Sequence, residues 1–83
     1  MNAHRETVYN VIKSNCNNGY TIKGYKLDPT EKTYGETPLL ELGLDETTIV
    51  NIKTHVERVS GKTIPNNIAR DWVTILDVEN ILK

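Results

Sequence analysis

The second half of the chain carries an apolar stripe at helical spacing, and this pattern limits the possible folds more than any other. Four β-branched residues recur at positions i, i+3, i+7 and i+10: Ile49, Ile52, Val56 and Val59. That period places them on one face of an α-helix. Asp45 is a favoured N-cap in front of the stripe, Glu46 suits the positive first turn, and Gly61 is a common terminator. We therefore expect a helix over residues 46–60 that packs on a core through this stripe.

A first helix is expected over residues 2–14. Asn2 is a suitable N-cap, and Val8, Val11 and Ile12 share one face of this helix. The Asn/Gly-rich segment 15–19 comes next, and both residue types tolerate the left-handed conformation in which helices end. The sequence therefore predicts that the first helix stops within this segment.

Two further helices are expected near the C-terminus. Ile64 is extended because a residue before proline avoids the α region, and residues 66–70 then form one short helical turn. Thr74 caps a final helix with Asp77 in its first turn. The apolar residues of that helix are Ile75, Val78, Ile81 and Leu82.

Residues 19–38 hold three glycines and two prolines, and they form the longest stretch without a helical pattern. We expect an ordered loop pinned to the bundle by four side chains: Tyr20, Ile22, Tyr25 and Leu27. A short hairpin in which residues 33–34 return against residues 20–27 remains open. The loop tyrosines, which include Tyr34, either attach the loop to the bundle or offer an aromatic surface to a partner; attachment is favoured.

The outline is an all-α fold: a four-helix bundle of three longer helices and one short helix, with a long first loop. Residues 1–83 fit a single domain, and at this size folding buries only about 60% of the surface of the unfolded chain. The core is therefore thin, and we expect Trp72 to fill it between the short helix and the last helix. A binding module fits this size better than an enzyme with a deep pocket.

Charge and hydropathy exclude several classes of partner. The net charge is −1, and the basic residues form no cluster of the kind that binds nucleic acid. Unbroken apolar runs such as Leu39-Leu40 are only two residues long, far too short to insert in a membrane. A single cysteine fits a reducing compartment. We expect a soluble cytoplasmic monomer.

No residue has a sequence context that favours catalysis or metal binding. The soft candidate ligands are single and widely separated: His4, Cys16 and His55. Cys16 has no neighbouring histidine or cation in the sequence to lower its pKa. We therefore expect no metal and no enzymatic activity.

Several residues together resemble the acyl and peptidyl carrier proteins, which bind phosphopantetheine. The family has a four-helix bundle with a long first loop, a short third helix, and a Leu-Gly-x-Asp-Ser sequence leading into its second helix. The corresponding residues here run from Leu42 to Glu46, followed by the Ile64-Pro65 step and the Thr74-Ile75 start of the last helix. The resemblance covers residues 39–82 without a gap and implies the carrier-protein bundle for this chain.

This chain departs from the family at the attachment residue, because Glu46 stands where the resemblance places the serine that receives 4′-phosphopantetheine. A carboxylate cannot form the stable phosphodiester. Thr47 and Thr48 supply hydroxyls next to it, but each step along a helix turns the side chain by about 100°. Glu46 suits the helix dipole by itself, and as a fixed negative charge it also resembles a phosphate.

The resemblance further implies a partner-binding face on the helix over residues 46–60. Its residues would be Asp45, Thr47, Val50, Asn51, Thr54, Glu57 and Arg58. We expect a non-catalytic module that binds proteins, such as biosynthetic enzymes, through this face and holds no cofactor. The alternative is a working carrier with 4′-phosphopantetheine, tethering acyl or aminoacyl thioesters in fatty-acid, polyketide or nonribosomal peptide synthesis.

Overall fold

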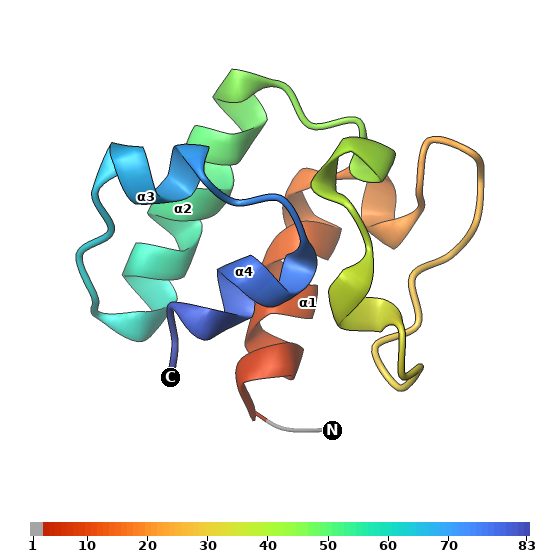
Figure 1. Cartoon of the computed structure of the whole chain (residues 1–83), viewed down its shortest axis with the longest axis horizontal. Helices are drawn as coiled ribbons and strands as arrows, with labels where there is room; N and C mark the ends of the chain where they lie inside the picture. The colour runs from red at the N-terminus through yellow and green to blue at the C-terminus, as the bar shows by residue number, and fades with distance from the viewer. Residues whose placement is uncertain (1–2) are drawn as a thin grey trace.

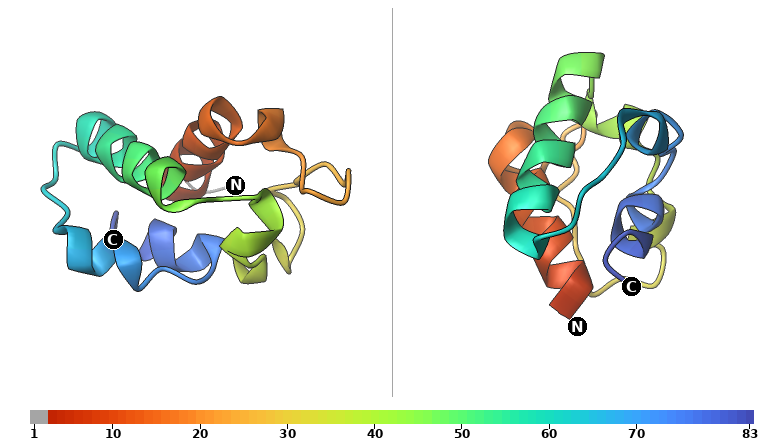
Figure 2. Two further views of the ribbon diagram at one scale, coloured as in Figure 1. Left: turned by 90° about the horizontal axis from the view of Figure 1, so that it is seen from above. Right: turned by 90° about the vertical axis from the view of Figure 1, so that its left-hand side faces the viewer.

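The computed structural model describes residues 3–83 and shows a helical bundle in two layers (Figure 1). Within this range there are four α-helices and no β-strand: α1 (Ala3–Asn15), α2 (Glu46–Ser60), α3 (Asn66–Arg70) and α4 (Ile75–Asn80). The predicted four-helix all-α fold is confirmed. In Figure 2, α1 and α2 form one layer, and α3 and α4 lie beneath them with part of the long loop. No helix in residues 3–83 is long and apolar enough to cross a membrane.

Left-handed residues end α1 where the sequence indicates. Asn17, Asn18 and Gly19 have φ angles of 42°, 56° and 88°. Val8, Val11 and Ile12 are buried, as their common face predicts. The proposed Asn2 cap lies outside the described residues.

Both ends of α2 follow the sequence pattern. The Asp45 carboxylate accepts a hydrogen bond from the backbone N–H of Thr48 at 2.7 Å, which caps the first turn. Gly61 ends the helix with a φ of 72°, a conformation that residues with a Cβ disfavour. The predicted boundaries over residues 46–60 are confirmed.

The apolar stripe of α2 is buried except at its last residue. Ile52 and Val56 lie in the core and Ile49 is half-buried, but Val59 is 50% exposed. The expectation for Val59 was wrong because this residue lies at the edge of the stripe, near the end of α2. It borders a shallow surface hollow beside His4 and Leu82.

The C-terminal helices are both short. α3 has the predicted bounds, but α4 ends at Asn80, so the bundle has two long and two short helices. After Asn80 the backbone tightens into i to i+3 hydrogen bonds, such as that from Leu82 N–H to the Glu79 carbonyl at 3.0 Å. Leu82 is nevertheless buried. At the other end of α4, the Asp77 carboxylate accepts the backbone N–H of Thr74 at 3.0 Å.

The long loop is ordered and contains three short 3-10 helices: η1 (Asn17–Gly19), η2 (Tyr34–Glu36) and η3 (Leu39–Leu42). The hairpin left open by the sequence does not form in the described chain; one antiparallel bridge joins Tyr20 to Lys26. Hydrogen bonds close the loop on itself, for example from Ile22 N–H to the Glu41 carbonyl at 2.7 Å. These backbone bonds order a segment that has few regular elements.

Only some of the residues expected to pin the loop to the bundle do so. Leu27 and Tyr34 are buried in the core. Tyr20, Ile22 and Tyr25 are exposed, so the expectation that they anchor the loop was wrong. Because backbone hydrogen bonds already hold this part of the loop, its side chains can remain in solvent.

A partly buried ion pair joins the two layers. The Glu79 residue on α4 is only 3% exposed, and its carboxylate accepts a hydrogen bond from Arg5 Nε on α1 at 3.2 Å. Arg5 also donates from Nη1 to the Pro29 carbonyl at 3.3 Å. Its guanidinium carbon lies 5.1 Å from the centroid of the Tyr34 ring, within the range of a cation–π interaction. Arg5 therefore ties α1, α4 and the long loop together.

We expect Arg5→Met to lower the free energy of unfolding by about 3 kcal/mol, because it leaves the Glu79 carboxylate buried without its charged partner. Urea unfolding followed by circular dichroism measures the change. Arg70→Met, at an exposed position on α3, is the matched control and should change stability by less than about 0.5 kcal/mol. Equal losses in the two variants would contradict this role of Arg5.

The Tyr34 hydroxyl is buried and has no hydrogen-bond partner within residues 3–83. Burial also raises the pKa of this hydroxyl. We expect Tyr34→Phe to keep the stability within about 1 kcal/mol of wild type or to raise it, because it removes a buried polar atom that makes no bond. Tyr34→Ala, which also removes the ring, should cost about 3–5 kcal/mol in the same urea titration. A large loss in Tyr34→Phe would show that the hydroxyl is bonded.

Candidate functional site

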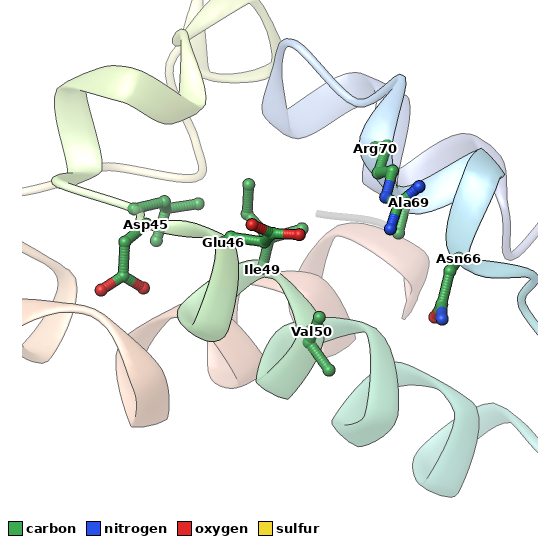
Figure 3. A pocket seen from close by; sticks show the side chains of 8 residues that line it. Asp45, Glu46, Ile49, Val50, Asn66, Ala69 and Arg70 are labelled. Atoms are coloured by element: carbon green, nitrogen blue, oxygen red, sulfur yellow. The ribbon is translucent and has the colours of Figure 1, made fainter.

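A groove of about 260 Å³ lies between the start of α2 and α3. Its floor and walls combine apolar, charged and amide side chains: Leu44, Asp45, Glu46, Ile49, Val50, Asn66, Ala69 and Arg70. Figure 3 shows the Glu46 side chain extending from α2 toward the side where α3 carries Asn66 and Arg70. Asp45 points away from α3 in the same view. The groove therefore has an apolar base, with Glu46 and Arg70 on different walls.

Glu46 is the first residue of α2 and is exposed at this groove. Its carboxylate lies at the positive end of the helix dipole, which stabilises a negative charge there. Arg70 is also exposed, and within residues 3–83 neither of these two side chains forms an ion pair. Both charges are therefore available to a binding partner.

The side chains next to Glu46 have distinct local roles. The Asp45 carboxylate accepts both the backbone N–H of Thr48 at 2.7 Å and the Thr48 hydroxyl at 2.8 Å. These bonds hold the pKa of Asp45 below its usual range. The Thr48 hydroxyl is thus engaged in the helix cap, whereas Thr47 is exposed. Ser60 is also engaged, since its hydroxyl donates to the Val56 carbonyl at 2.6 Å.

Most residues of the predicted partner-binding face do lie on the solvent side of α2. Apart from the cap residue Asp45, the exposed members are Thr47, Val50, Asn51, Thr54 and Arg58. Val50 is 42% exposed and also lines the groove, so it is the apolar residue that connects the groove with this face. We call these five residues the α2 outer face.

Glu57 differs from the prediction because its carboxylate is turned toward the protein. One oxygen accepts the backbone N–H of Ile64 at 2.7 Å, and the other accepts Lys53 Nζ at 3.1 Å. The Ile64 N–H and then the Lys53 ammonium lower the pKa of Glu57. Glu57 therefore holds the segment after α2 in place rather than extending to a partner.

The residues considered for reactive chemistry show no arrangement that favours catalysis or metal binding within residues 3–83. Burial raises the pKa of the Cys16 thiol to about 11, so this thiol is protonated at neutral pH. His4 is exposed, and His55 Nδ1 lies 3.2 Å from the Asn15 side-chain amide nitrogen, which links α1 to α2. Within residues 3–83 no three His, Cys, Asp or Glu side chains gather as a metal site would require.

A second groove adjoins the first and was missed by sequence reasoning. It has a volume of about 180 Å³, and all its lining residues are apolar: Pro38, Leu39, Leu40, Leu44, Ile49, Trp72 and Val73. Trp72 is buried at its base, as the expected core position requires. The contributing residues come from η3, α2 and the segment before α4. The sequence drew attention to Ile49 and Trp72 as core residues and to Leu39-Leu40 as a short apolar run, but not to a groove that joins them. The sequence also gave no reason to place Arg70 at a site, because its position there depends on how α3 faces α2.

No protein-family model, curated protein or solved structure matches this chain. The resemblance of residues 42–46 to the carrier-protein attachment sequence therefore remains a prediction. Its support is the position of these residues at the start of α2 and beside the groove.

We expect the stability of the protein to fall on acidification below about pH 5. Hydrogen bonds lower the pKa of Asp45, Glu57 and Asp77; for Asp77 the donors are the backbone N–H groups of Val73 and Thr74. A carboxyl group with a lower pKa in the folded state stabilises the fold above its unfolded pKa of about 4, and this contribution disappears as the pH falls through the folded value.

Urea unfolding between neutral and acidic pH tests this expectation. Glu57→Gln and Asp77→Asn should each be less stable than wild type at neutral pH, and the difference should shrink in acid. Glu31→Gln changes an exposed carboxylate in the long loop and is the control. A difference that stays constant with pH would show that these carboxylates do not act through their charge.

Proposed function

We propose that this chain is a non-catalytic carrier-fold module that acts through protein contacts, with Glu46 at the position of the phosphopantetheine attachment residue. The observation that carries the proposal is the place of Glu46. It directly follows the Asp45 cap, begins α2 and is exposed beside a groove. A prosthetic group attached at this position would leave the protein surface freely, so the position suits the function of a carrier even though the residue does not.

The carboxylate of Glu46 gives the module a fixed charge in place of a transferable group. The helix dipole stabilises this charge, and this alone is sufficient reason for a glutamate at the first helical position. In addition, an enzyme that recognises a carrier would meet a negative charge where the phosphodiester normally lies. The same residue can therefore stabilise α2 and preserve recognition.

The α2 outer face is the surface proposed to contact the partner. It combines the exposed Val50 with polar neighbours and ends in the cation Arg58. A central apolar residue surrounded by polar ones is the usual composition of a small protein interface. Biosynthetic enzymes that act on carrier proteins are the proposed partners.

The second candidate is a working carrier that uses another hydroxyl. Thr47 is the group to consider, because it is exposed beside Glu46 while the Thr48 and Ser60 hydroxyls are hydrogen-bonded within the protein. Its direction differs from that of Glu46 by about 100° around the helix axis. A transferase fitted to the first position would have to accept that change.

Incubation with coenzyme A and a promiscuous phosphopantetheinyl transferase separates these candidates. Intact-mass measurement should show phosphopantetheine addition to Glu46→Ser and none to the native chain. Glu46→Ala is the matched control and should stay unmodified. Modification of the native chain that disappears in Thr47→Ala would establish the working carrier. If neither the native chain nor Glu46→Ser is modified, the carrier register proposed for Glu46 is wrong.

The α2 outer face is tested by substitution of its central residue. With carrier-dependent enzymes as the partners, Val50→Asp should weaken association by about tenfold or more, since it buries a charge in the contact. Val59→Asp changes an equally accessible valine near the other end of α2 and is the control. Calorimetric titration gives both affinities. Equal effects of the two substitutions would show that Val50 does not lie in the interface.

A further inference from the structure

The apolar groove between η3 and the segment before α4 has exposed apolar side chains on its rim. Leu40 is 80% exposed and Val73 is 65% exposed, and both line this groove. They are held next to each other, because Leu39 N–H donates to the Val73 carbonyl at 2.8 Å and Pro38 pairs with Thr74 in a bridge. Contiguous exposed apolar surface of this kind marks a contact site.

The chain around this groove is acidic. Every residue that lines it belongs to segments 33–52 or 71–82. These segments contain no lysine or arginine, and they hold seven of the eleven acidic residues: Glu36, Glu41, Asp45, Glu46, Asp71, Asp77 and Glu79. The ten basic residues all lie elsewhere in the chain. The near-neutral total charge therefore conceals an uneven distribution of charge along the sequence.

Several of these carboxylates lie beside the groove itself. Asp71 is exposed and directly precedes Trp72, and the Asp77 carboxylate accepts the backbone N–H of Val73 at 2.8 Å. Asp45 and Glu46 line the adjoining groove. Glu41 lines a different hollow, together with Lys26. Glu79 is excluded, because Arg5 neutralises it inside the bundle. Arg70 is the nearest cation in sequence and lies on the wall of the adjoining groove. The rim of the apolar groove is thus negatively charged.

Charge determines which occupant fits. A second copy of this chain would bring an equally acidic rim against this one, and like charges that face each other across an interface are unfavourable. Nucleic acid and anionic lipid surfaces are repelled in the same way. A segment with apolar side chains that fill the groove and basic residues on either side that pair with the acidic rim is complementary to this surface.

We propose that this groove binds a cationic amphipathic helix of a partner protein. The groove of about 180 Å³ takes one large apolar side chain, and the adjoining groove, which shares Leu44 and Ile49 with it, takes a second one. Two apolar anchors on one face of a helix can fill the two adjoining grooves. Lysine or arginine residues beside the anchors pair with Asp71, next to the apolar groove, and with Glu46 in the adjoining groove. The proposal does not depend on the carrier register of Glu46.

Selection from a displayed library of helical peptides on the full 83-residue chain tests the proposal. The peptides that bind should share apolar residues at i and i+4 with lysine or arginine at the positions between and around them. A peptide synthesised from this consensus should bind saturably in calorimetry, and more weakly as salt is raised. No consensus, or an acidic one, would overturn the proposal.

Substitutions then locate the site with that peptide. Leu40→Ser and Val73→Ser should each weaken binding by about tenfold, while Val59→Ser, a matched exposed valine on α2, should leave it unchanged. Asp71→Asn should weaken binding less and reduce its salt dependence. Circular dichroism confirms that the variants are folded, which their exposed positions favour. Unchanged binding to Leu40→Ser would overturn the proposal.

Sedimentation of the chain alone excludes the competing occupant. The chain should sediment as a monomer over the concentrations used for binding. Self-association that Leu40→Ser abolishes and Val59→Ser retains would assign the groove to a second copy, and the proposal of a basic partner helix would be wrong. The mass experiment on Glu46 is unaffected by either result, so the two proposals fail separately.

Discussion

The contact between Arg5 and Glu79 is the constraint on which the rest of the structure depends. A carboxylate buried to this degree is unfavourable unless a charge and hydrogen bonds compensate for its lost hydration, and Arg5 supplies both from the opposite layer. The same guanidinium contacts Pro29 and the Tyr34 ring. In a chain with so thin a core, this polar contact ties α1, α4 and the long loop together. Backbone hydrogen bonds from Leu39 N–H to the Val73 carbonyl and from Ile75 N–H to the Thr37 carbonyl then hold η3 beside the start of α4.

The parts of the fold that depend on local sequence could be predicted. The Asp45 cap, the Gly61 terminator and the left-handed residues after α1 act within a few residues of themselves, and the structure places each where the pattern indicates. Features that depend on tertiary packing could not. Val59 has the right spacing but lies at the edge of its stripe, and Tyr25 remains in solvent because backbone bonds already order the loop. The Arg5 and Glu79 pair spans 74 residues, and no sequence pattern points to it.

The same division applies to the candidate site. Glu46 and the exposed side of α2 were predicted, because a helix pattern fixes both its first residue and its solvent side. Glu57 shares that pattern, but a backbone N–H from the following segment takes its carboxylate. The two grooves were not predicted, because each is formed by segments that are distant in the sequence. The acidity of the segments that form the apolar groove was hidden because the total charge averages over the whole chain.

Trp72 makes binding in the apolar groove observable by fluorescence. It is the only tryptophan in the chain, and it lies at the base of the apolar groove, with an indole nitrogen that is buried and unbonded within residues 3–83. An indole in such surroundings emits at shorter wavelength than one in water, and its emission responds when nearby solvent is displaced. The protein therefore contains an intrinsic optical reporter in the apolar groove, and filling of this groove can be followed in the unlabelled wild-type chain.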